Sequence, residues 1–172
     1  MPESQRSLFR VRDARPAELD DISMVITAAY QEYAAFFEPA AWDTYAQNIA
    51  DVRSRLAESD LIVAEQDGRI LGAVTFYPDG SRAQHETWPA GWAGIRLLAV
   101  HPSSRGRGIG RALMAECLQR CRKRGVATVG LHTTEVMAVA RKMYERMGFV
   151  RAPEFDFHPA SGAVVMAYRF DL

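Results

Sequence analysis

One stretch of the chain, AVHPSSRGRGIGRALMAECLQRC from Ala99, most constrains the fold. It overlaps the end of an apolar run at 92–100, which predicts a central strand, and continues into a segment of helical periodicity that ends at Gly125. Between strand and helix, arginines and glycines nearly alternate: Arg105, Gly106, Arg107, Gly108, Gly110 and Arg111. A buried strand joined by a glycine-rich turn to a helix predicts a domain that combines helices with a sheet.

The glycine-rich turn can bind an anion, because unpaired N–H groups and the dipole at a helix start favour negative charge. Glycines let the backbone approach a phosphate closely, and Arg105 and Arg111 can add charge-assisted hydrogen bonds. We therefore expect a pyrophosphate ligand, and the simpler alternative is a turn with solvated arginines. A nucleotide P-loop needs a lysine after Gly110, and a dinucleotide motif needs a glycine at the position of Arg111, so both fit less well.

The remaining periodicities complete an α/β or α+β domain built on a mixed sheet. Helices are expected from Pro16 to Tyr33, over Trp42–Leu56 and over Val136–Met147. A hairpin is expected over 61–77, turning at Asp67-Gly68, and a long loop over 78–91. Further strands are expected at 7–14, 126–132, 149–152 and 163–170.

Length and composition set the broad class. A chain of 172 residues, 48% hydrophobic and 24% charged, fits a single globular domain over residues 1–172. The formal net charge of zero argues against nucleic acid or an anionic membrane as partner. No apolar run approaches a membrane span or a signal peptide, so we expect a cytoplasmic protein. Cys117 and Cys121 lack nearby Cys or His, so we expect small buried thiols and no metal site.

Two motifs together resemble the GNAT superfamily of acetyl-CoA-dependent N-acetyltransferases. LLAVHPSSRGRGIGRALM is similar to its acetyl-coenzyme A signature, Arg/Gln-x-x-Gly-x-Gly/Ala, matched at Arg105, Gly108 and Gly110. MAVARKMYERMGFVRA is similar to a later helix of the family, in which a tyrosine precedes Gly-Phe. The match is strongest over about residues 92–152. The resemblance implies a mixed, mostly antiparallel sheet of about seven strands flanked by four helices.

The resemblance also implies where acetyl-CoA would bind as co-substrate. In the family the strand before the loop splays from the strand at 126–132, the pantetheine arm lies in the gap, and the loop wraps the pyrophosphate. A backbone N–H near Val100 would polarise the thioester carbonyl. The expected cofactor-binding residues are Leu98, Ala99, Val100, Arg105, Gly106, Arg107, Gly108, Ile109, Gly110 and Arg111.

The implied reaction is direct attack of a neutral amine on the thioester, and Tyr144 matches the general acid of the family. A phenol of pKa near 10 can protonate a thiolate of similar basicity. The alternative is a core aromatic at helical spacing between Ala140 and Met147.

The general base is where this sequence departs from the family. Many members carry a glutamate on the strand before the loop, but Gly94 stands there and Arg96 is the charged residue of that strand. Candidate bases in predicted loops, each more often a solvated residue, are Glu38, His85, Glu86, Asp156 and His158. Ala138 replaces a family asparagine, and His132, Thr133 and Thr134 are the nearby polar residues. The hydroxyls of Thr133 or Thr134 can bond the cofactor or cap the next helix; we favour capping.

The acceptor is expected against the first two helices and the 78–91 loop. Phe36 and Phe37 either line an apolar acceptor pocket or belong to the core. The leading hypothesis is an acyltransferase enzyme that acetylates a primary amine of a small molecule. The alternatives are acetylation of a protein N-terminus or lysine, an acyl-CoA sensor without turnover, and a nucleotide-binding enzyme. By analogy with the superfamily, a homodimer is an open prospect.

Overall fold

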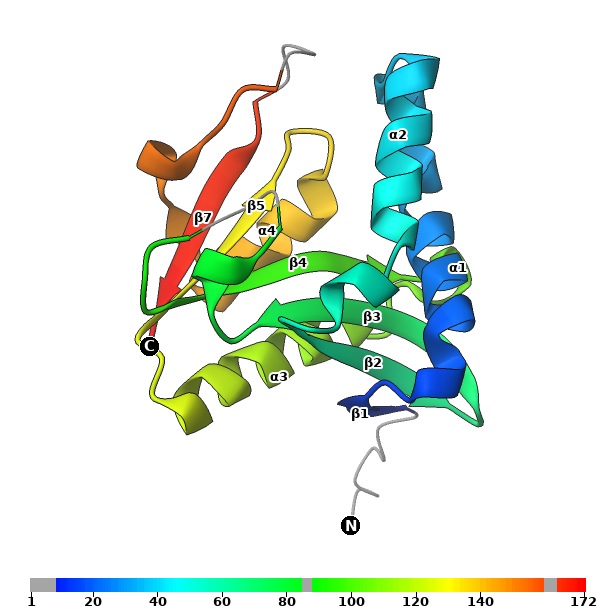
Figure 1. Ribbon diagram of the computed structural model, residues 1–172, viewed down its shortest axis with the longest axis horizontal. Coiled ribbons are helices and arrows are strands. Elements are labelled where there is room, and N and C mark those ends of the chain that lie inside the picture. The colour runs from blue at the N-terminus through cyan, green and yellow to red at the C-terminus, as the bar shows by residue number, and fades with distance from the viewer. Residues whose placement is uncertain (1–8, 85–87, 160–163) are drawn as a thin grey trace.

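The computed structural model describes residues 9–84, 88–159 and 164–172 (Figure 1). Its strands form one sheet in the order β1-β2-β3-β4-β5-β7-β6. Neighbouring strands are antiparallel except for the parallel pair of β4 and β5. The strands are β1 (Arg10–Asp13), β2 (Asp60–Gln66), β3 (Arg69–Tyr77), β4 (Trp92–Val100), β5 (Thr128–Thr133), β6 (Val150–Arg151) and β7 (Met166–Asp171).

The α-helices of the described ranges are α1 (Leu19–Tyr30), α2 (Pro39–Ala50), α3 (Ile109–Arg124) and α4 (Ala138–Met147). The expected sheet of seven strands with four helices is therefore confirmed. The helix predicted over Trp42–Leu56 was placed too late: α2 starts at Pro39, and Val52 and Leu56 lie beyond its end. Proline suits a first helical position, which explains the earlier start.

The two larger of three hydrophobic clusters in the described residues lie on opposite faces of the sheet. Successive residues of β2 alternate between them: Leu61 and Val63 pack with α1 and α2, whereas Ile62 and Ala64 pack with α3 and α4. This alternation is the period of two that a strand covered on both faces requires. Figure 1 shows α1 and α2 together on one side of the sheet; α3 packs on the other, mainly against β3 and β4.

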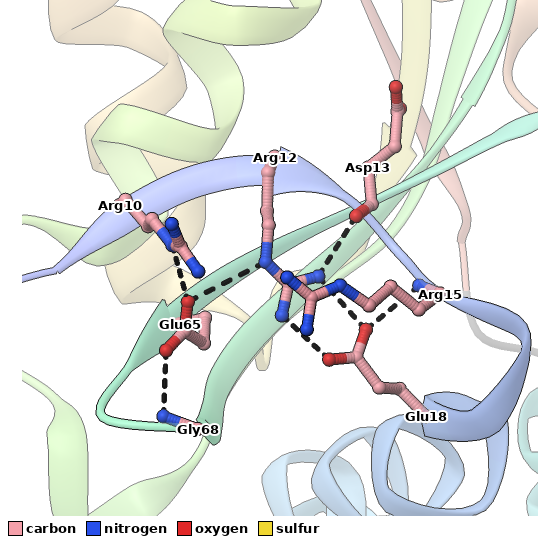
Figure 2. Close-up of polar contacts among 7 residues, drawn as sticks. All are labelled: Arg10, Arg12, Asp13, Arg15, Glu18, Glu65 and Gly68. Carbon is pink, nitrogen blue, oxygen red and sulfur yellow. Dashed lines mark hydrogen bonds and ion pairs between the residues drawn. The ribbon is translucent and has the colours of Figure 1, made fainter.

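Ion pairs fix β1 to the hairpin and to the approach to α1 (Figure 2). Glu65 accepts hydrogen bonds from Arg10 Nε at 2.6 Å and from the Gly68 N–H at 2.7 Å. Arg12 donates two hydrogen bonds to Glu18, at 2.6 and 2.9 Å, and the Arg15 N–H donates a third. These contacts lower the pKa of Glu18 from its ordinary value of 4.5 to about 2, chiefly through the hydrogen bonds from Arg12.

Candidate active site

The sheet opens between β4 and β5. Their parallel pairing runs from Trp92 with Thr128 to Ile95 with Leu131 and then stops, although both strands continue. In the pairing of β3 with β4, Leu97 and Leu98 together lie opposite Val74, which is a β-bulge. Leu97 has φ 54°, a left-handed conformation that is uncommon for leucine. The bulge turns β4 away from β5, so a gap forms where the family resemblance places the pantetheine arm.

A cavity of about 420 Å³ occupies this gap and reaches the start of α3. Arg107 is not among its lining residues, because its guanidinium donates to Gln66 Oε1 at 2.7 Å. The Leu98 carbonyl already accepts a hydrogen bond from the Tyr30 hydroxyl at 3.2 Å. The predicted cofactor-binding residues that line the cavity are Leu98, Ala99, Val100, Arg105, Gly106, Gly108, Ile109, Gly110 and Arg111.

The glycine-rich loop has the backbone conformation that only glycine adopts readily. Gly106 and Gly108 have φ 77° and 78°, and a β-carbon at either would meet no atom within 4 Å, so conformation and not space requires glycine. Gly108 is the N-cap of α3 and offers no side-chain acceptor, which leaves the first N–H groups of the helix available to an anion.

Arg105 joins this loop to the opposite wall of the cavity. Its guanidinium donates to the Ala29 carbonyl at 3.1 Å and pairs with the Glu32 carboxylate at 2.9 Å. Ala29 lies on α1, and Glu32 lies on the short 3-10 helix η2 (Gln31–Phe36). Arg105 therefore holds the loop in place as well as adding positive charge beside it.

Tyr144 lies on α4, is 7% exposed and lines the same cavity. Its ring contacts Phe149 at a centroid distance of 5.9 Å and packs in the core shared with α3. Helix α4 ends at Gly148, whose φ of 103° requires glycine. The ring of Tyr144 therefore belongs to the core, as the structural interpretation expects, and the residue also borders the cavity. Its role as general acid stays a prediction.

The glycine at the family's glutamate position has a steric cause. Gly94 pairs with Gly130 across β4 and β5, and the indole of Trp88 covers both. A β-carbon would lie 3.1 Å from Trp88 at position 94 and 2.6 Å from its ring at position 130. Trp88 is 4% exposed, so a side chain at position 94 would require this buried indole to shift.

The bases considered from the sequence do not reach the cavity among the described residues. Asp156 is held by Arg151 at 2.6 Å and by the Ala167 N–H at 2.7 Å, which lowers its pKa to about 2. Glu38 is the N-cap of α2, and His158 is exposed; neither lines the cavity. His85 and Glu86 lie outside the described residues.

His132 borders the cavity, and it was not among the candidate bases expected from the sequence. Its Nε2 lies 3.0 Å from the Phe155 carbonyl oxygen. Its ring stacks on Trp88 with 4.5 Å between the ring centroids. The predicted strand at 126–132 ended in His132, so the residue was treated as a strand terminus. Strand alternation puts it on the same face as Gly130, and that signal could have identified it.

The capping role favoured for Thr133 and Thr134 was wrong. Helix α4 has Met137 as its N-cap and no side-chain cap. Both hydroxyl oxygens are buried without a hydrogen-bond partner in the described part of the chain. Thr133, 3% exposed, lines the cavity, and a buried hydroxyl without a partner is costly unless a ligand bonds it. The strand simply continues through Thr133, which removes it from the helix start.

Phe36 and Phe37 do not line the cavity. Phe36 is 66% exposed, and Phe37 stacks on Tyr45 at 5.3 Å, so the structure places one in solvent and one in packing between helices. The wall on that side is formed instead by Tyr30, Tyr33 and Arg96. Arg96 is buried, and its Nη2 donates to Asn48 Oδ1 at 3.3 Å.

Two further properties concern metals and membranes. No cluster of three His, Cys, Asp or Glu side chains that could hold a metal ion occurs within 9–84, 88–159 and 164–172. Over the same ranges, no helix has the length and apolarity to cross a membrane.

Cys117 and Cys121 are buried, and burial raises the pKa of the Cys121 thiol to about 11, as expected for inert thiols.

Comparison with known proteins places the sequence in a family. The Acetyltransferase (GNAT) family model matches residues 26–149. Mycothiol acetyltransferases from Cellulomonas flavigena and Thermomonospora curvata are 38% and 33% identical over 59% and 66% of this chain. The alignments cover only 31% and 35% of those proteins, so the chain spans about a third of their length. An N-acetyltransferase of Schizosaccharomyces pombe is 25% identical over 88% of both chains.

Solved structures show the same fold. A GNAT acetyltransferase from Brucella melitensis in complex with acetyl-CoA has a TM-score of 0.62 and 26% identity over 84% of each chain. The PaiA N-acetyltransferase from Thermoplasma acidophilum in complex with coenzyme A has a TM-score of 0.72 and 16% identity, over 94% of this chain and 99% of that one. Since the family model matches well over half of the sequence, the chain belongs to the GNAT acetyltransferase family.

Proposed function

We propose that the protein transfers the acetyl group of acetyl-CoA to a primary amine of a small molecule. The observation that carries this proposal is a single cavity that joins the open start of α3, the gap between β4 and β5, and Tyr144. The mycothiol acetyltransferases among the relatives support a small-molecule acceptor.

The described residues suit each part of the cofactor. The first N–H groups of α3, with Arg111 beside them, suit the pyrophosphate. The ends of β4 and β5, which do not pair with one another, suit a pantetheine arm, which carries amides that can bond strand backbone. The hydroxyl of Thr133, buried and without a hydrogen-bond partner in the described residues, would bond a polar group of that arm.

The chemistry follows from what the reaction must move. The amine nitrogen attacks the thioester carbon, a C–N bond forms, and the C–S bond breaks. The developing oxyanion needs a donor, which a backbone N–H near Val100 can supply. The departing thiolate takes the proton of the Tyr144 hydroxyl, because the two groups have similar basicity.

The first test concerns the ligand. Acetyl-CoA should raise the melting temperature of the purified protein, whereas NAD and ATP should not. Gly108→Asp should abolish that increase while the protein remains folded, because a carboxylate at the helix start repels the pyrophosphate. Stabilisation by ATP or NAD alone would contradict the proposal.

The second test concerns the acceptor. Thiol release from acetyl-CoA is measured with phenethylamine, glucosamine, spermidine and a peptide with a free N-terminal alanine. Faster release with one of the small amines supports the proposal. Release with the peptide alone would assign a protein acceptor. No release above the rate without amine, despite tight acetyl-CoA binding, would make the protein a sensor.

A further inference from the structure

We propose that His132 accepts the proton that the acceptor amine must lose. This inference rests on the proposed acetyl transfer and deepens it. An ammonium group has no lone pair, so the reaction needs a base near the amine. Gly94 carries no basic side chain, so the base must come from another position of this protein.

Among the described residues that line the cavity, two carry side chains basic enough at neutral pH: Glu32 and His132. The Glu32 carboxylate lies 2.9 Å from the Arg105 guanidinium and is about half exposed. This ion pair engages both carboxylate oxygens of Glu32 with Arg105. We therefore assign the role of base to His132.

The hydrogen bond of His132 selects its tautomer. A carbonyl oxygen can only accept, so Nε2, at 3.0 Å from the Phe155 oxygen, carries the hydrogen. In the neutral ring Nδ1 then holds the lone pair. Phe155 is not a lining residue, so this bond orients the ring from outside the cavity. An oriented base of known tautomer is what general-base catalysis requires.

Packing holds the imidazole in one position. Trp88 stacks on it at 4.5 Å with an interplanar angle of 20°, and Phe157 meets it edge-on at 5.0 Å. Trp88 is itself seated over Gly94 and Gly130. The two glycines thus have a catalytic consequence: they admit the indole that fixes the histidine.

Charged groups approach His132 from two elements of the fold. The Asp156 carboxylate interacts electrostatically with His132 and is ionised, because Arg151 and the Ala167 N–H hold it in that form. Arg96 on β4 brings a positive charge to the same cavity. The Trp88 ring stacks on the imidazole, and the face of an aromatic ring can stabilise a cation.

Two groups, His132 and Tyr144, take up the two protons that the ammonium nitrogen loses. His132 Nδ1 is buried in the structure, so the amine reaches it once the side chains over it move. The ammonium then gives one proton to Nδ1, and the nitrogen lone pair forms the C–N bond. As the C–S bond breaks, Tyr144 protonates the sulfur and recovers the second proton of the nitrogen. The imidazolium then releases its proton to solvent. The sum is ammonium plus acetyl-CoA giving amide, free thiol and one proton.

The test compares His132→Gln with His158→Gln. Glutamine can still donate to the Phe155 carbonyl but has no basicity, and His158 is an exposed histidine away from the cavity. The amine of the panel that wild type acetylates is used across the pH range in which the proteins stay folded. We expect kcat of His132→Gln to fall by about 10²-fold at neutral pH, with unchanged stabilisation by acetyl-CoA.

The pH profile separates a base from a structural residue. For wild type and His158→Gln, kcat/KM should rise with pH along an acidic limb and then level off. In His132→Gln the levelling should disappear, and the rate should keep rising by about tenfold per pH unit with the neutral fraction of the amine. An unchanged profile in His132→Gln, or loss of the levelling in Glu32→Gln instead, would overturn the assignment.

A second measurement does not depend on turnover. Nitrogen NMR of ¹⁵N-histidine-labelled protein, assigned with His132→Gln, should show the neutral tautomer protonated at Nε2. Protonation at Nδ1 would overturn the proposal. Failure of the proposed function would look different, since wild type would then acetylate none of the amines.

Discussion

The two halves of the β4–β5 pair differ in how their polar groups are satisfied. From Trp92 to Ile95 the strands pair in parallel, and Trp88 seals their surface over Gly94 and Gly130. From Arg96 to Val100 the pairing is absent, and a cavity takes its place. In the paired half, strand pairing satisfies the facing backbone groups without a ligand. The open half leaves a buried hydroxyl, at Thr133, without a hydrogen-bond partner in the described residues.

This difference shows how one strand pair can serve both stability and binding. The paired half fixes the relative position of β4 and β5, and the bulge at Leu97 and Leu98 separates their ends. Substitutions in the paired half should therefore change the free energy of unfolding. Substitutions in the open half should change binding or turnover while the fold persists.

The largest expected effect lies in the open half, at Tyr144. Tyr144→Phe removes the hydroxyl but keeps the ring in its packing with Phe149. We expect kcat to fall by about 10²-fold or more, because the thiolate then leaves without a proton donor. Acetyl-CoA binding, measured by calorimetry, should change little. Unchanged turnover would return Tyr144 to a purely structural role.

The sealed half is tested with Gly130→Ala. The added methyl would lie 2.6 Å from the Trp88 ring, so Trp88 must shift, and we expect a loss of about 1–3 kcal/mol in unfolding free energy. Gly110→Ala is the matched control, since its nearest contact would be an ordinary 3.6 Å and it lies in the first turn of α3. Urea denaturation without ligand measures both. Equal stability of the two variants would mean that Trp88 does not seal this half.

A smaller effect is expected at Thr133. Thr133→Val keeps the shape of the side chain and removes a buried hydroxyl that lacks a partner in the described chain. The protein should become no less stable, while the Kd for acetyl-CoA should rise by about fivefold, the worth of one hydrogen bond. An unaltered Kd would show that the hydroxyl does not contact the cofactor.

The smallest expected effect, on the free energy of unfolding, is at Glu18, away from both halves of the β4–β5 pair. Its pKa is lowered to about 2, so its ion pair with Arg12 stabilises the fold fully above the ordinary value of 4.5 and loses that contribution as the pH falls toward 2. Glu18→Gln should lower the unfolding free energy by about 1 kcal/mol at neutral pH. That difference should shrink on acidification, measured by denaturation at several pH values. A pH-independent difference would assign the effect to packing.

The fold was predictable because its signals are local. The Asp67-Gly68 hairpin, the glycine-rich turn before α3 and the glycine that ends α4 each follow from a few neighbouring residues. The site was predictable only along those same segments. Nine of the ten cofactor-binding residues expected from the glycine-rich motif and the strand before it line the cavity; the tenth, Arg107, bonds Gln66.

What could not be predicted depends on contacts between distant segments. The role of Gly94 needs Trp88, which comes from a loop, and the orientation of His132 needs Phe155. Phe36 and Phe37 have the composition of a pocket wall, yet tertiary packing directs one outward and the other onto Tyr45. The two threonines have the propensity of helix caps, but the strand extends through Thr133 and the helix begins later.

The left-handed backbone conformation of Leu97 in β4 has a consequence for the kinetics of ligand binding. A non-glycine residue in this conformation costs about 1–2 kcal/mol, and the protein meets that cost once, during folding. An incoming thioester consequently breaks no strand–strand hydrogen bonds on arrival. Its association should follow simple second-order behaviour, without a slow isomerisation step that gates entry.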